Sequence, residues 1–209
     1  MINTSVDLIQ LDVHNWLEGN WPEYQQWVEG NEIPEEAVLQ SFLAEFARPS
    51  DLGQLLHYLR ALGRTPLLHL NRVIATACCA IYSSATELTH HQSNHSALMI
   101  TAIDLGFTEY LFAELLAEVR RRQTFGVPLV RNQHVEFILA ELQARLFALA
   151  ALWELTAENP DLPGDLELFQ SLSGPLLREL ADQYLQFSGG RGYLKGHAAE
   201  LAFRQVVLG

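Results

Sequence analysis

The stretch that decides the fold runs from residue 97 to residue 126 and reads ALMITAIDLGFTEYLFAELLAEVRRRQTFG. Its apolar side chains, from Leu98 to Val119, fall on every side of a helix rather than on one stripe. A helix that is apolar all round lies at the centre of a bundle or at a subunit interface. The stretch therefore predicts a surrounded helix over 97–122, followed by a turn at Gln123-Thr124-Phe125-Gly126.

The rest of the second half also has the helical period. It predicts helices over 132–158 and 165–187 and a short last helix over 197–207. Pro175 is expected to kink the second of these helices, and Gly189-Gly190 to end it. Since no alternating pattern typical of a β-strand has a useful length, we predict an all-α protein with a four-helix bundle in its second half.

The first half predicts a smaller set of helices, bounded by proline, serine and glycine residues, over 6–17, 22–28, 34–48, 50–63 and 65–88. Apolar periodicity stops between 83 and 96, and Thr89 to His95 is predicted to be a connecting loop. We place a domain junction there. The expected domains are a helical N-terminal region, 1–92, and the bundle, 93–209.

Composition excludes several classes of protein. A chain of 209 residues with 49% hydrophobic and 18% charged residues is folded and globular. The net charge of -12 argues against a nucleic-acid partner. Arg120-Arg121-Arg122 is the local exception, where an anion could bind, although such a triplet is also typical of a solvated helix end.

The sequence also bears on location. No apolar run reaches the roughly 18 to 20 residues of a membrane span, and residues 1–7 show no basic and apolar export signal. Cys78 and Cys79 are neighbours, too close in the chain for an unstrained disulfide, and lie in an apolar run. Buried thiols fit a reducing compartment, so we expect a cytoplasmic protein without a membrane partner.

Two motifs carry a family resemblance. They are Arg122-Gln123-Thr124-Phe125-Gly126 and Gln186-Phe187-Ser188-Gly189-Gly190-Arg191-Gly192-Tyr193, with Gln133 and Leu139-Ala140-Glu141-Leu142 between them. In order and spacing they resemble the C-terminal helical domain of the acyl-CoA dehydrogenase family over about 97–208. The first half is more weakly similar to that family's N-terminal helical domain.

The resemblance implies an FAD site shared with a neighbouring subunit. Guanidinium and amide groups can hold a pyrophosphate, and glycine lets backbone approach it. The residues it implies as FAD contacts are Arg122, Thr124, Phe125, Gln133, Gln186, Gly189 and Gly190. An alternative interpretation makes Phe125 a core residue, Gly189-Gly190 a helix stop and Gln186 a surface residue.

The resemblance also implies a catalytic base. In many family members a glutamate past the glycine turn removes the substrate's α-proton while the flavin takes the β-hydride, and Glu200 stands at that position. Arg204 matches the arginine that follows it. A carboxylate in an apolar pocket could act as a base near neutral pH, and we expect such a pocket around Glu200. The alternative is an ordinary helix glutamate.

Several departures from the family pattern point to an incomplete FAD site. No segment could form the family's middle β-domain, Gln205 replaces the usual aspartate, and the sequence ends before the expected Glu-Gly-Thr segment. Three hypotheses follow. In the first, the chain is a reduced flavoprotein of the CH-CH oxidoreductase class that acts on an acyl thioester, as a homodimer or with a fuller dehydrogenase subunit. In the second, it is a non-catalytic assembly subunit. In the third, it is a cofactor-free protein that binds an acyl thioester.

A histidine cluster raises a separate alternative. His91 and His95 have i,i+4 spacing, with His90 adjacent and Glu87 one turn earlier, so they could bind zinc if this segment were helical. Histidines in polar loops are typically solvated. We therefore predict no metal site.

Overall fold

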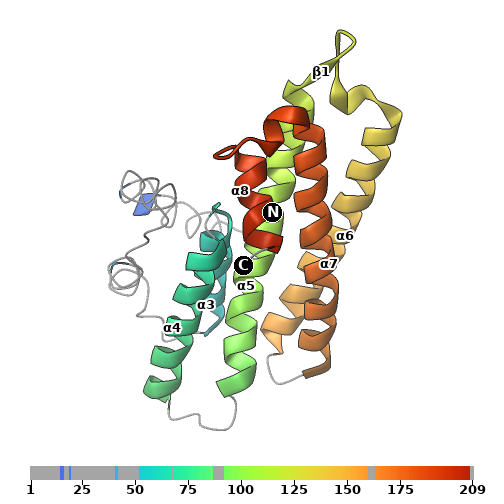
Figure 1. Ribbon diagram of the computed structural model, residues 1–209. Coiled ribbons are helices and arrows are strands. Elements are labelled where there is room, and N and C mark those ends of the chain that lie inside the picture. The colour runs from blue at the N-terminus through green and yellow to red at the C-terminus, as the bar shows by residue number, and fades with distance from the viewer. Residues whose placement is uncertain are drawn as a thin grey trace.

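The computed structural model describes residues 15–16, 19, 41, 52–66, 68–86, 92–159 and 163–207. Almost all of the helices predicted over 6–17, 22–28 and 34–48 lie outside these residues. The elements in order are α3 (Leu52–Gly63), α4 (Leu68–Thr86), α5 (Gln92–Arg121), β1 (Gln123–Thr124), β2 (Val127–Pro128), the 3-10 turn η1 (Leu129–Arg131), α6 (Gln133–Glu158), α7 (Pro163–Ser188), the 3-10 turn η2 (Gly189–Tyr193) and α8 (Ala198–Val207) (Figure 1).

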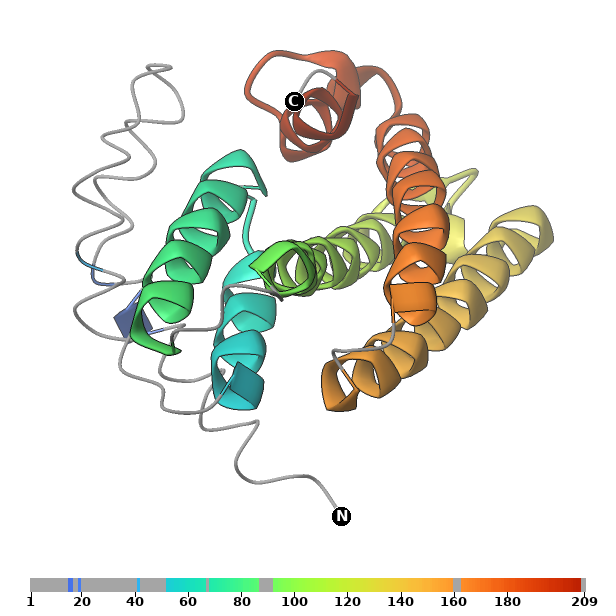
Figure 2. The same cartoon turned by 90° about the horizontal axis from the view of Figure 1, so that it is seen from below.

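Helix α5 lies at the centre of the molecule, as its all-round apolar pattern predicts. Seen along the bundle, it separates the α3–α4 pair from the α6–α7 pair (Figure 2). Leu98, Phe107, Leu111 and Val119 are fully or almost fully buried along its length. The predicted all-α fold with a helical bundle in the second half is confirmed.

The backbones of α3 and α5 touch where the two helices cross. A Cβ atom on Gly106 would lie 2.1 Å from the carbonyl oxygen of Arg60, and one on Gly63 would lie 2.4 Å from that of Ile103. Only glycine fits on both sides of this contact. Gly63 does end α3 as predicted, but its second role is this close approach.

Three helix boundaries differ from the sequence prediction. Helix α5 begins at Gln92, so the prediction that the connecting loop continues to His95 is wrong for its last four residues. The sequence of this first turn, Gln92-Ser93-Asn94-His95, is polar and has no apolar period, so the start of the helix leaves no hydrophobic signal. Helix α4 begins at Leu68 rather than at Thr65. The third difference is at α7, which starts earlier, at Pro163, with proline at a favourable first position.

The helix ends around the bundle follow the sequence signals. Asn132 caps α6, and its side chain accepts a hydrogen bond from the backbone N–H of His134 at 3.0 Å. Helix α7 includes Pro175 without a break and ends at Ser188. Gly189 then takes a positive φ of 64°, which stops the helix as predicted.

The segment His95–Arg121 within α5 is long and apolar enough to cross a membrane by length and composition. Length and composition alone do not distinguish a membrane span from a core helix, so the expectation that the chain has no membrane span stays a prediction. The hydrophobicity of this segment has another cause, because 56% of its apolar window is buried inside the protein. The same property makes α5 the core helix.

Candidate functional site

The first motif forms a tight hairpin after α5. Gln123 pairs with Pro128 and Thr124 with Val127 in antiparallel register. At the tip, Phe125 and Gly126 have positive φ angles of 54° and 81°, as a two-residue hairpin turn requires. Because the Phe125 side chain is fully exposed, the alternative interpretation of Phe125 as a core residue is wrong.

The second motif is joined to the first by Arg122. Its Nη1 atom donates a hydrogen bond to the carbonyl oxygen of Phe187 at 2.5 Å. Its guanidinium also lies against Gly189, where a Cβ atom would come within 2.7 Å of Nη2. A cation at the C-terminal end of α7 is favourable there because the last carbonyls of a helix carry partial negative charge. Arg122 therefore fixes the hairpin to the glycine turn.

The other predicted FAD contacts lie at the same end of the bundle (Figure 1). Gln133 and Gln186 are exposed, at the start of α6 and near the end of α7, and Thr124 is half-buried in the hairpin. Gly190 is exposed, with open space where a side chain would be. Gln186 also lines an open groove along α7, together with Gly174, Pro175, Arg178, Glu179, Asp182 and Gln183.

Glu200 sits in the first turn of α8. Its carboxylate pairs with Arg204 at 3.3 Å and accepts a hydrogen bond from the backbone N–H of Gly196 at 3.3 Å. Its side chain is 23% exposed. The apolar pocket expected around Glu200 stays a prediction. Gln205 ties the same helix to the α3–α4 connection, since its Nε2 donates to the Pro66 carbonyl oxygen at 2.5 Å.

Residues 86–208 match the model of the acyl-CoA dehydrogenase C-terminal domain. The chain belongs to the acyl-CoA dehydrogenase family. The matched region contains both motifs and Glu200, and it begins close to the predicted domain junction at 92. The division into two domains stays a prediction.

Relatives of known name match the same part of the chain. Cyclohexane-1-carbonyl-CoA dehydrogenase of Geobacter metallireducens is 29% identical over 116 residues, which are 52% of this chain and 30% of that protein. A probable acyl-CoA dehydrogenase of Bacillus subtilis, YngJ, is 26% identical over 116 residues, 53% of this chain and 30% of its own. The chain thus spans less than a third of these relatives.

A solved structure shows the same fold. Butyryl-CoA dehydrogenase from Megasphaera elsdenii aligns with a TM-score of 0.50 at 19% identity, over 65% of this chain and 33% of that one. At this identity the likeness concerns the fold alone. It agrees with the helical C-terminal domain that the family predicts.

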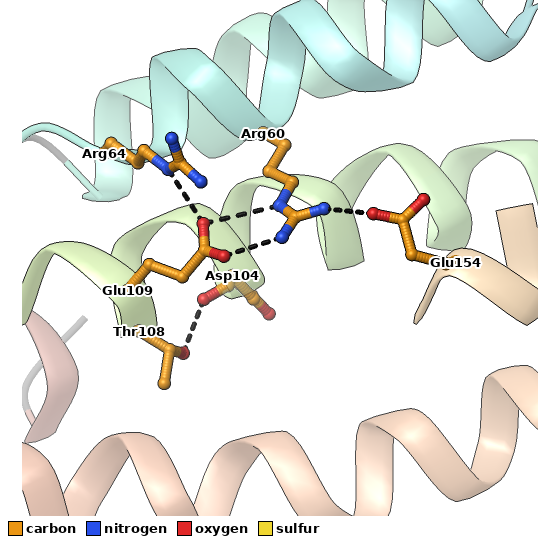
Figure 3. Close-up of polar contacts among 6 residues, drawn as sticks. All are labelled: Arg60, Arg64, Asp104, Thr108, Glu109 and Glu154. Atoms are coloured by element: carbon orange, nitrogen blue, oxygen red, sulfur yellow. Dashed lines mark hydrogen bonds and ion pairs between the residues drawn. The ribbon is translucent and has the colours of Figure 1, made fainter. Parts of the chain in front are cut away.

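In this family member, sequence reasoning missed a cluster of charged residues between α3, α5 and α6 (Figure 3). Arg60 binds Glu109 at 2.6 Å and Glu154 at 2.5 Å, while Arg64 binds Glu109 at 2.8 Å. Arg60 also lies over the buried Trp153 ring, 5.1 Å from its centroid. Two features of the sequence could have indicated this cluster. They are an acid, Glu109, inside an apolar helix, and two arginines, Arg60 and Arg64, at i,i+4 spacing.

Two acids of α5 have opposite pKa shifts. Burial alone would raise the pKa of Glu109, but the hydrogen bonds and charges of Arg60 and Arg64 outweigh burial and lower it. For Asp104, burial raises the pKa, and the ion pair with Arg72 at 2.8 Å only partly opposes this. Both acids join α5 to the helices before it.

The histidine alternative can be followed at His95 alone, since His90 and His91 lie outside the described residues. His95 is buried, with its ring edge-on to Tyr82 at 5.9 Å between centroids. Among the described residues, no three His, Cys, Asp or Glu side chains are grouped to hold a metal ion.

The lowered pKa of Glu109 makes an acid-dependent prediction. Because the folded pKa lies below the ordinary value of 4.5, the stabilisation from Glu109 is complete above that value and is lost as the pH falls through the folded pKa. We expect the free energy of unfolding to fall between about pH 5 and pH 3, and to fall less steeply in Glu109→Gln. Urea unfolding at each pH measures both slopes. Equal slopes would contradict the pairing.

Proposed function

We propose that the chain supplies one side of an FAD-dependent dehydrogenase site for acyl thioesters, and that a fuller dehydrogenase subunit completes it. The family is FAD-dependent. The observation that carries the proposal is the contact of Arg122 with Phe187 and Gly189. It holds two motifs, 65 residues apart in the chain, at one end of the bundle.

The exposed residues at this end fit one side of the cofactor. Gln133 and Gln186 present amide groups, Phe125 presents an apolar ring, and the backbone at Gly190 is open to a ligand. The guanidinium of Arg122 already contacts the end of α7. We therefore assign Arg122 to holding the glycine turn in place as well as to contacting the cofactor.

When bound, FAD supplies the hydride acceptor for the oxidation. We propose that Glu200 removes the substrate's α-proton, since its carboxylate is partly exposed and held in place by Arg204 and Gly196. Arg204 therefore acts as a positioning residue. Cys78 and Cys79 are both buried in the core, which supports a cytoplasmic location, and we also propose that location.

A second candidate function is that of a non-catalytic assembly subunit. Two contacts within the chain favour it. Arg122 donates to the Phe187 carbonyl oxygen and Glu200 pairs with Arg204, so both residues stabilise the fold as well as standing at site positions. In that case Glu200→Gln has no effect on the biological role. Under the first proposal, Glu200→Gln retains flavin but abolishes its bleaching by an acyl thioester.

The test uses flavin retention. The chain is mixed with FAD and an acyl-CoA dehydrogenase apo-subunit from the same organism, and the visible absorbance that co-elutes on gel filtration is measured. We expect Gly190→Leu to remove this absorbance, because the new side chain covers the open backbone. Gly164→Leu, at an exposed glycine with open space in the first turn of α7, is the matched control and should retain it. Equal retention in both variants would contradict the site.

A further inference from the structure

The turn between η2 and α8 carries the only lysine of the chain. Of the 13 lysine and arginine residues, Lys195 alone is a lysine. The turn lies at the end of the bundle that carries the hairpin (Figure 1). Lys195 is exposed, and Gly196 after it has a positive φ of 87° and open space where a side chain would be. The turn therefore presents a primary amine to solvent.

Two large apolar side chains immediately precede this amine. Tyr193 and Leu194 are each 62% exposed. The backbone around them is held by two hydrogen bonds of 3.0 Å, from the N–H of Leu194 to the carbonyl oxygen of Arg191 and from the N–H of His197 to that of Leu194. The turn thus has a fixed backbone and an open apolar surface. An acyl chain is a ligand that such a surface would remove from water.

The local charge is opposite in sign to that of the whole chain. Residues 189–207 contain three bases, Arg191, Lys195 and Arg204, and one acid, Glu200, against a net charge of -12 for the chain. Glu200 is bound by Arg204 and by the backbone N–H of Gly196. In the part of the chain that the structure describes, Lys195 makes no ion pair. A thioester on a phosphate-bearing carrier is attracted to such a surface.

Lys195 also lies beside the proposed site for the acyl thioester. The backbone N–H of Gly196 donates to the Glu200 carboxylate at 3.3 Å. In the proposed function this carboxylate faces the α-carbon of the substrate, and the thioester carbonyl carbon is one bond away from that atom. The amine of a lysine extends up to about 6 Å from its own Cα atom, which is well past the next residue. The amine of Lys195 can therefore reach the thioester carbonyl carbon.

We propose that Lys195 is a self-acylation site, to which a thioester bound at this turn transfers its acyl group. The uncharged amine attacks the thioester carbonyl carbon. A C–N bond forms, the C–S bond breaks, and the thiolate leaves with the proton that the nitrogen loses. The products are an Nε-acyl-lysine and a free thiol, and no oxidant is needed. The inference rests on the thioester-binding part of the proposed function and requires no flavin.

Mass spectrometry of the full chain without FAD tests the site, with hexanoyl-CoA as the probe. The matched control moves the lysine, because Lys195→Arg combined with Gln143→Lys places it at an exposed position in the middle of α6. We expect Lys195, located by peptide mapping, to gain a hexanoyl group at least about tenfold faster than the lysine introduced at 143, since binding holds the reactants together. The rate should also level off as the probe concentration rises. Equal rates at the two positions, or a rate that never saturates, overturns the proposal.

A second variant tests the apolar side chains of the turn. Leu194→Ser keeps the lysine and should lower the acylation rate about fivefold, because the acyl chain loses apolar surface to cover. An unchanged rate would overturn the proposal. The flavin test of the proposed function does not involve Lys195, so the two can fail separately. Flavin retention without acylation would overturn only this inference, and saturable acylation without flavin retention would overturn only the flavin site.

Discussion

Gly106→Ala is expected to lower the free energy of unfolding by about 3 kcal/mol, near the upper end for overpacking. The added methyl would lie 2.1 Å from the Arg60 carbonyl oxygen and 2.9 Å from the Cα atom of Gly63. Since both are backbone atoms, α3 and α5 must separate to admit it. Urea unfolding followed by circular dichroism measures the loss.

Gly164→Ala is the matched control for this variant. Gly164 lies in the first turn of α7, is exposed and has nothing within 4 Å of a new Cβ atom. Alanine should therefore be neutral or stabilise the protein by up to about 1 kcal/mol through its helix propensity. If Gly106→Ala were as harmless as this control, the close contact between α3 and α5 would be wrong.

Arg60→Met should destabilise the protein by about 3 kcal/mol, at the lower end for breaking a buried ion pair. The Arg60 and Glu109 side chains are only 15% and 18% exposed, so water cannot replace the lost contacts. Arg64 still pairs with Glu109, which keeps the loss from being larger. The contact over Trp153 is lost as well.

Two further variants separate charge from volume in this cluster. Arg145→Met breaks a pair whose side chains are 38% and 40% exposed, and should cost less than about 1 kcal/mol. Arg60→Met combined with Glu109→Leu removes both buried charges and should recover at least half of the single-variant loss. No recovery would show that shape, rather than unpaired charge, causes the loss.

Much of the fold could be predicted because it follows from local patterns. The all-round apolar character of α5 indicates a central helix, and Asn132 and Gly189 mark helix ends by their own backbone preferences. The start of α5 was placed too late because its first turn, Gln92 to His95, is polar and has no apolar period. That turn looks like a loop in the sequence.

The candidate site was predicted less completely because its contacts are long-range. The two motifs indicate lineage, but only the structure shows that Arg122 reaches Phe187 and leaves no room beside Gly189. The cluster around Arg60 depends on a pairing across 49 residues, which no spacing rule detects. The pair of Glu200 and Arg204 was within reach, since i,i+4 acid and base residues meet on a helix.

The measurement that bears most directly on the proposed half-site is the visible absorption spectrum of the natural chain after incubation with FAD and gel filtration. It is taken for the chain alone and for the chain mixed with the dehydrogenase apo-subunit. We expect little or no flavin with the chain alone, and a flavin spectrum co-eluting with the mixed complex. Absence of flavin from the chain in both conditions would contradict the proposal that it forms one side of an FAD site.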